Sequence, residues 1–208
     1  MSLKRIVCFG DSITQGTGMP DADRWPGRLA FLLEKKAGDP DRCEVYNRGV
    51  GGDTTALALD RIQRDVLPLL PATVLIEFGI NDSYVYPGRR TSRVGVFDYE
   101  QNLKEIVRLV RDSAGVPVLI VNHPLTRRKD VHRQGNGLAI GKNLEPYNRI
   151  VRRVAKQTGT RSIDLPQDLK KRRIGVEASC SEDGVHLSPE GSRFYAEIVF
   201  EKLIPCRH

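Results

Sequence analysis

Short, unbroken apolar runs recur along this chain and alternate with stretches that carry a helical repeat. Five of these runs have the length of strands, at 6–9, 43–46, 74–78, 116–121 and, more weakly, 161–165. Strands without a polar face are typical of a parallel sheet, because both faces of such a sheet are covered by helices.

Helical periodicity fills the spaces between the runs. Residues 99–113 and 144–155 both place apolar side chains at i, i+3, i+4 and i+7. A further helix should begin after Ser188, which would act as its N-cap, with Pro189 in the first turn. The alternation implies right-handed crossovers and predicts an α/β protein, a three-layer α/β/α sandwich around a parallel sheet.

Two long stretches, 83–98 and 124–143, lack a regular pattern and interrupt strand-to-helix connections. Loops of that length in a small domain are usually functional or disordered. Both leave the carboxyl ends of predicted strands, so we expect both to overhang a site there. The basic run Arg127-Arg128-Lys129 lies in the second loop, where such runs most often form solvated surface.

Composition narrows the class of protein. With 208 residues and 39% hydrophobic content, one domain is expected. The chain has no membrane-span run and no signal peptide, which favours a cytoplasmic location unless the chain was trimmed. The four cysteines form no C-x-x-C pair, which disfavours a zinc or redox site. The net charge of +7 suits anionic ligands, but no aromatic-interleaved basic stripe indicates nucleic acid.

Ser12 is the first candidate for chemistry. It follows the apolar run 6–9 within Gly10-Asp11-Ser12, and a serine there is exposed at the carboxyl end of a sheet, where open α/β folds place their sites. The tripeptide alone is ordinary turn composition. If a helix begins just after Ser12, its amide and its hydroxyl point to the same place, so the amide can donate to an oxyanion.

Two glycine-containing segments follow later strands. Segment 49–55 reads Gly-Val-Gly-Gly-Asp-Thr-Thr and is consistent with a turn in which Asp53 or Thr54 caps a helix. It does not match the dinucleotide pattern G-x-G-x-x-G. Segment 79–82, Gly-Ile-Asn-Asp, ends the most hydrophobic strand, and the amide of Asn81 is a neutral donor suited to an oxyanion.

Asp183 and His186 are three positions apart near the other end of the chain. On one tight turn this spacing brings a carboxylate and an imidazole to the same side. Asp183-Gly184 is also consistent with a plain turn and His186 with a surface side chain. The functional alternative has Asp183 accepting from Nδ1–H of His186, which leaves Nε2 to take a proton from Ser12.

Together these segments resemble the four sequence blocks of the SGNH hydrolases, also called GDSL esterases or lipases. The blocks are Gly-Asp-Ser at 10–12, Gly-Gly-Asp-Thr at 51–54, Gly-x-Asn-Asp at 79–82 and Asp-x-x-His at 183–186. The resemblance covers nearly the whole chain, so residues 1–208 are expected to form a single hydrolase domain. It implies a flavodoxin-like sandwich with a five-stranded parallel sheet.

The resemblance also implies a role for each matching residue. Ser12 would be the nucleophile, His186 the base and Asp183 its orienter, while Gly52 and Asn81 would donate to the oxyanion with the Ser12 amide. Gly52 is chosen over its neighbouring glycines because it directly precedes Asp-Thr. No metal or organic cofactor is expected.

The sequence therefore predicts a serine esterase that cleaves a small-molecule or lipid ester. Lysophospholipids, acyl thioesters, short aryl esters and acetylated sugars all stay open as substrates, because family members differ mainly in their loops. The alternative is a catalytically idle module that binds carbohydrate or another anionic ligand. The intact four blocks argue against it.

Overall fold

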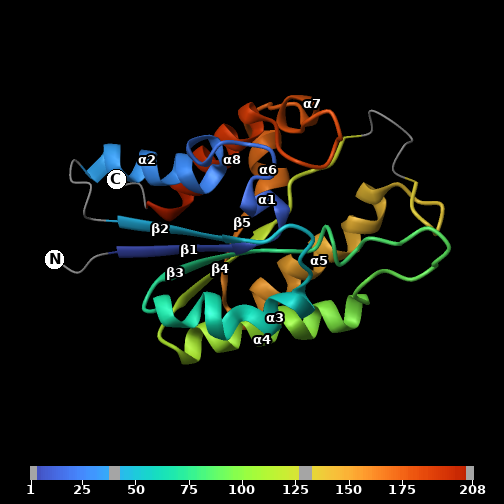
Figure 1. Cartoon of the computed structure of the whole chain (residues 1–208), viewed down its shortest axis with the longest axis horizontal. Coiled ribbons are helices and arrows are strands. Elements are labelled where there is room, and N and C mark those ends of the chain that lie inside the picture. Colours follow the sequence, from blue (N-terminus) through green and yellow to red (C-terminus); the bar gives the residue numbers. More distant parts are fainter. Residues whose placement is uncertain (1–3, 38–42, 127–132, 205–208) are drawn as a thin grey trace.

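The structure, a computed structural model, describes residues 4–37, 43–126 and 133–204. Its centre is one sheet of five parallel strands in the order β2-β1-β3-β4-β5 (Figure 1). The strands are β1 (Lys4–Gly10), β2 (Cys43–Gly49), β3 (Thr73–Glu77), β4 (Val116–Val121) and β5 (Arg161–Asp164). This is the flavodoxin-like order, so the predicted five-stranded parallel sheet is confirmed.

Helices cover both faces of the sheet and complete the predicted three-layer sandwich (Figure 1). One layer contains α2 (Trp25–Ala37), α6 (Leu165–Lys171), α7 (Val176–Ser179) and α8 (Pro189–Leu203). The other contains α3 (Thr55–Asp65), α4 (Val96–Asp112) and α5 (Ile140–Thr158). A short helix, α1 (Ser12–Gln15), follows β1. None of the helices within the described residues has the length and apolar character needed to span a membrane.

Helix starts differ from the predictions where no capping side chain marks them. Helix α4 begins at Val96 and α5 at Ile140, several residues before the predicted starts. Their N-cap residues, Gly95 and Ala139, make no side-chain cap hydrogen bond. By contrast, Ser188 Oγ accepts from the Gly191 amide at 2.9 Å, and α8 begins where predicted.

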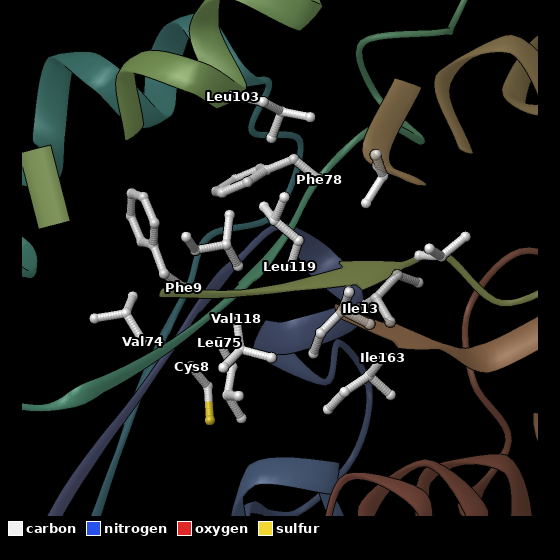
Figure 2. Packing of buried hydrophobic residues seen from close by; sticks show 14 of the residues in the cluster. Cys8, Phe9, Ile13, Val74, Leu75, Phe78, Leu103, Val118, Leu119 and Ile163 are labelled. Carbon is white, nitrogen blue, oxygen red and sulfur yellow. The ribbon is translucent and has the colours of Figure 1, made fainter. Parts of the chain in front are cut away.

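The core lies on both sides of the sheet, because successive side chains of a strand point to opposite faces. Figure 2 shows this alternation in β1, β3 and β4. The row toward α2 and α8 is Cys8, Leu75 and Val118, and the row toward α3 and α4 is Phe9, Ile76 and Leu119. All six side chains are buried. Burial on both sides explains why these stretches of β1, β3 and β4 have no polar face.

The two irregular stretches pack against each other beyond the carboxyl ends of β3 and β4. The Val85 amide donates to Gln134 Oε1 at 2.7 Å, and the Gly135 amide donates to the Val85 carbonyl at 3.1 Å. Tyr147 of α5 fastens the first loop by donating to the Val94 carbonyl at 2.6 Å. The basic run 127–129 lies outside the described residues.

Candidate active site

Strand order brings three of the four predicted segments together. Because β1 lies between β2 and β3, Ser12 has segment 50–53 on one side and segment 78–82 on the other. Gly49 permits the close approach of β2 to α1, since a Cβ there would lie 2.1 Å from the Gln15 amide nitrogen. The site is therefore built at the carboxyl edge of the sheet, as expected.

Helix α1 begins at Ser12 itself, one residue before the predicted start. Asp11 is its N-cap, and Asp11 Oδ1 accepts from the Ile13 amide at 2.9 Å. In the first helical residue the amide has no intrahelical acceptor. No acceptor for the Ser12 amide is present elsewhere in the described chain either. Ser12 therefore presents both a hydroxyl and an unused N–H group.

A hydrogen-bonded chain links Ser12, His186 and Asp183. Ser12 Oγ lies 2.9 Å from His186 Nε2, and His186 Nδ1 lies 2.6 Å from Asp183 Oδ2. Because the carboxylate can only accept, Nδ1 carries the proton toward Asp183, and Nε2 is left to accept from the serine hydroxyl. The structure thus brings together three residues that the sequence separates by up to 174 positions.

Within the described residues, the side chain of Asp183, on the rim of the site, accepts from four groups. Besides His186 Nδ1, these are the Val185 amide at 2.8 Å, the His186 amide at 2.9 Å and Ser181 Oγ at 2.8 Å. Partial burial acts to raise the pKa of this carboxyl, but the hydrogen bonds outweigh it and hold the pKa well below its usual range. Asp183 is therefore ionised, as an orienting carboxylate requires.

Residues 50–53 form a tight turn beside Ser12. The Asp53 amide donates to the Val50 carbonyl at 3.2 Å, and Gly52, the third residue, has a φ of 81°. A positive φ at this position defines a type II turn and favours glycine. Within the described residues, the Gly52 amide has no acceptor. Gly52 thus offers a second unused backbone donor.

The end of the turn resolves the two capping alternatives. Thr54 caps α3, because its hydroxyl accepts from the Leu57 amide at 3.4 Å. Asp53 instead pairs with the buried guanidinium of Arg61, at 2.5 Å. Arg61 also donates to the Gly10 carbonyl at 3.0 Å, so one side chain ties the turn to the segment before Ser12.

Asn81 approaches Ser12 from the β3 side. Its Nδ2 donates to Asp11 Oδ2 at 3.2 Å, and Asp11 directly precedes Ser12. An amide nitrogen carries two hydrogens, so one N–H group stays free for another acceptor. Asp11 therefore orients the amide of Asn81, a role that the sequence alone did not indicate.

Three fully buried acids lie beneath the site: Asp11, Asp82 and Glu77. Burial raises the pKa of Asp11 to about 7, aided by the nearby Asp82, and it raises the pKa of Asp82 to about 6. The pKa of Glu77 is raised well above its usual range by the same cause. Asp82 Oδ1 accepts from the amide and hydroxyl of Thr55, at 2.9 and 2.5 Å. These contacts join segment 78–82 to the start of α3.

His123 is a buried histidine just after β4 that contacts the segment carrying Asp183 and His186. Its Nε2 lies 2.8 Å from the Val185 carbonyl, to which it donates. Burial lowers the pKa of His123 to about 4, so the ring is neutral at pH 7. This contact joins His123 to the residue before His186 across 62 positions, and no local sequence pattern indicates it.

A cavity of about 670 Å³ adjoins the segment that carries Asp183 and His186. It lies between α5 and residues 123–126, and Thr126 of its wall donates its amide to the Gly184 carbonyl at 3.0 Å. Its lining combines apolar side chains such as Leu125, Ile140 and Leu144 with basic ones such as Lys142 and Arg149. The second irregular loop therefore borders a cavity beside the site.

Known proteins resemble the whole chain. An isoamyl acetate-hydrolyzing esterase 1 homolog from Bos taurus is 33% identical over 213 residues, which cover 97% of this chain and 80% of that protein. A lipase/acylhydrolase from Enterococcus faecalis aligns with a TM-score of 0.78 at 22% identity, over 97% of this chain and 95% of that one. An acetyl xylan esterase aligns with a TM-score of 0.77 at 23% identity, over 96% and 100%.

The two solved structures share this fold, so the expected SGNH hydrolase fold is confirmed. A family model described as the GDSL-like Lipase/Acylhydrolase family matches residues 8–194. That range includes all four segments that carried the resemblance in the sequence. With Ser12, the turn at 50–53, Asn81 and the Asp183–His186 pair all inside the match, the chain belongs to the GDSL-like lipase/acylhydrolase family.

Proposed function

We propose that this chain is a serine esterase that cleaves carboxylic esters through an acyl-enzyme intermediate. Family membership and the esterase relative support ester hydrolysis in general. The observation that carries the specific mechanism is the chain of hydrogen bonds from Asp183 through His186 to Ser12, at 2.6 and 2.9 Å. A nucleophile, a base and a group that orients the base are the parts that acyl transfer requires.

In the first half-reaction, Ser12 Oγ attacks the ester carbonyl while Nε2 of His186 takes the hydroxyl proton. Asp183 stabilises the imidazolium that forms and holds the ring in the right tautomer. The tetrahedral intermediate collapses when its bond to the alcohol oxygen breaks. His186 returns the proton to that oxygen, so the alcohol leaves neutral and the acyl group stays on Ser12.

Three donors are proposed to hold the oxyanion of this intermediate: the amides of Ser12 and Gly52 and the side chain of Asn81. The two backbone amides have no acceptor in the described chain, and Asn81 has one free N–H group. Donors fixed in place before the reaction stabilise developing charge without reorganisation. Removal of such a donor typically lowers kcat by roughly 10² to 10³.

In the second half-reaction, water replaces the alcohol. His186 takes one of its protons while the oxygen attacks the acyl carbonyl, and the same three donors hold the second oxyanion. Cleavage of the bond to Ser12 Oγ then releases the carboxylic acid, and His186 returns the proton to the serine. The cycle restores the starting enzyme.

The proposed substrates are short-chain esters such as acetates. The mammalian relative is named for hydrolysis of isoamyl acetate, and the chain matches 80% of its length. Lysophospholipids and acyl thioesters are alternatives that a substrate series would separate. A panel of p-nitrophenyl esters from acetate to palmitate, with one acyl thioester, should give the highest kcat/KM for acetate or butyrate.

Replacement of Ser12 by alanine tests the mechanism. We expect Ser12→Ala to lower kcat by at least about 10³ and to abolish labelling by a fluorophosphonate, because no other group supplies the nucleophile. The thermal midpoint should change little, since the lost hydroxyl is only half-buried. Ser113→Ala, at the opposite end of the sheet after α4, is the matched control and should behave like the parent.

Turnover or labelling at the parental rate in Ser12→Ala would remove Ser12 as the nucleophile. Absence of turnover on every ester, together with no labelling of the parent, would favour the idle binding module instead. In that case ester or sugar ligands would bind without being cleaved.

A further inference from the structure

We propose that Arg93 is a positioning residue for the oxyanion hole, acting through Gly52 from the loop between β3 and α4. This inference rests on the proposed function, because it takes the Gly52 amide as an oxyanion donor. Arg93 Nη1 donates to the Gly52 carbonyl oxygen at 2.9 Å. The amide and the carbonyl of Gly52 flank one Cα, so a bond to the carbonyl restricts how the residue can turn.

Gly52 has little else to hold it. It is exposed, and a Cβ at this position would meet no atom within 4 Å, so no side chain packs on Gly52 itself, although the buried pair of Asp53 and Arg61 holds the end of the turn. The turn's own bond, from the Asp53 amide to the Val50 carbonyl, is long at 3.2 Å. Among the described residues, Arg93 is the side chain that hydrogen-bonds Gly52. Loss of the hydrogen bond from Arg93 should therefore make the orientation of the Gly52 amide less well defined.

Arg93 itself is fixed to the segment that carries the other donor. Its amide donates to the Tyr84 carbonyl at 2.9 Å, and the Tyr84 amide donates to the Asn81 carbonyl at 3.2 Å. Its guanidinium lies 5.9 Å from the ring centroid of Tyr86, within the range of a cation–π contact. A continuous path of contacts therefore runs from Asn81 to Gly52, and Arg93 sets the relative position of the two donors.

The charge of Arg93 supports the same role. No carboxylate oxygen lies within 4.0 Å of its guanidinium in the parts of the chain that the structure describes. A positive charge that forms no ion pair within the described chain, bonded to the residue that offers the donor, favours the negative charge of the transition state over the neutral ester. The effect should therefore be in kcat and not in substrate affinity.

The test compares Arg93→Met, Arg93→Lys and Arg90→Gln on p-nitrophenyl acetate. Arg90 is the matched control, because it is exposed in the same loop and forms no hydrogen bond or ion pair with the described residues. We expect Arg93→Met to lower kcat by about 10- to 50-fold with KM within about twofold. Arg93→Lys, which keeps a charged donor, should recover about half of the loss on a logarithmic scale, and Arg90→Gln should match the parent.

Thermal midpoints close to that of the parent would show that Arg93→Met is folded, and Arg93→Lys provides the folded comparison if it is not. The inference is overturned if Arg93→Met and Arg93→Lys both keep the parental kcat, or if only KM rises, which would make Arg93 a substrate-binding residue. Ser12→Ala in the same assay separates the two proposals. An active Ser12→Ala refutes the proposed function, whereas an inactive Ser12→Ala beside a normal Arg93→Met refutes only this inference.

Discussion

Asp183 contacts His186, and Asp11 directly precedes Ser12 and contacts Asn81. Their surroundings nevertheless shift the pKa values of the two carboxyl groups in opposite directions. Asp183 has a side chain that is 45% exposed and accepts hydrogen bonds from four groups, so its pKa is held well below the usual range. Asp11 is fully buried and accepts from two donors, and burial raises its pKa to about 7.

The comparison shows that the number of donors and the access of water, and not the residue type, decide which acid stays charged. In the proposed mechanism, the negative charge of Asp183 on the rim stabilises the imidazolium of His186. Beneath the site, Asp11 accepts hydrogen bonds that orient Asn81 and cap α1. A full negative charge on this buried group would be costly, because water cannot solvate it. Two aspartates therefore have different roles, Asp183 as a charged group and Asp11 as a buried hydrogen-bond acceptor.

The largest predicted effect comes from neutralising the rim carboxylate. We expect Asp183→Asn to lower kcat by about 10³ to 10⁴, because an amide favours the wrong tautomer of His186 and cannot stabilise its charged form. The measurement is kcat on p-nitrophenyl acetate between pH 6 and 9. Loss at every pH in that range is expected.

The same substitution at Asp11, beneath the site, tests the difference between the two carboxyl groups. Asp11→Asn keeps an acceptor for the Ile13 amide but sets an NH2 group against Nδ2 of Asn81. The amide of Asn81 would have to turn, and we expect kcat to fall by only about 10- to 100-fold. Equal losses in Asp11→Asn and Asp183→Asn would contradict the division of roles.

A smaller effect is expected on stability at neutral pH. Burial raises the pKa of Asp82 to about 6, so its favourable contribution is complete below about pH 4 and is lost as the pH rises through about 6. Asp82→Asn removes this loss and keeps an acceptor for Thr55. Relative to the variant, the parent should therefore lose about 1 to 3 kcal/mol of unfolding free energy between pH 4 and 8.

Urea denaturation at four pH values would measure this difference. Glu105→Gln is the control, because Glu105 is an exposed carboxylate on α4 paired with Arg108. The parent should not lose unfolding free energy relative to Glu105→Gln between pH 4 and 8. Parallel pH profiles for the parent and Asp82→Asn would show that Asp82 has no raised pKa.

The smallest predicted effect is on stability at acidic pH. It comes from Asp183 on the rim of the site, and its pH dependence is opposite to that of Asp82. The pKa of Asp183 is lowered, so its contribution is present above about pH 4 and is lost as the pH falls further. Because the side chain is 45% exposed, solvent screening should limit the contribution to about 1 kcal/mol. Between pH 5 and 2 the parent should lose that much more stability than Asp183→Asn in urea titrations. A larger loss of stability at acidic pH in Asp183→Asn than in the parent would contradict a lowered pKa of Asp183.

The fold was predictable to a large extent because its cues are local. Apolar runs located all five strands within a few residues, and Ser188 with Pro189 marked the start of α8. The first turns of α4 and α5 were missed, since Gly95 and Ala139 give no capping cue. Periodicity finds the buried face of a helix and not its exposed beginning.

The site was predictable only in part. Motif residues such as Ser12 and Asn81 stand out in the sequence, but the residues that hold them do not. Arg61 reaches the Gly10 carbonyl across 51 positions, and Arg93 reaches Gly52 across 41. Contacts of that range depend on how strands are ordered in the sheet, and no local pattern records them.

Ser12 and His186 are 174 positions apart in the sequence, yet they lie in hydrogen-bond contact. The contact between them therefore depends on how the segment that carries Asp183 and His186 is held against the rest of the fold. Helix α8 follows the Asp183–His186 segment directly and packs on α2, where Tyr195 stacks on Trp25 at 4.6 Å. Local unfolding that separated α8 from α2 would also loosen the segment that precedes α8, so the contact between His186 and Ser12 depends on packing that lies outside the site.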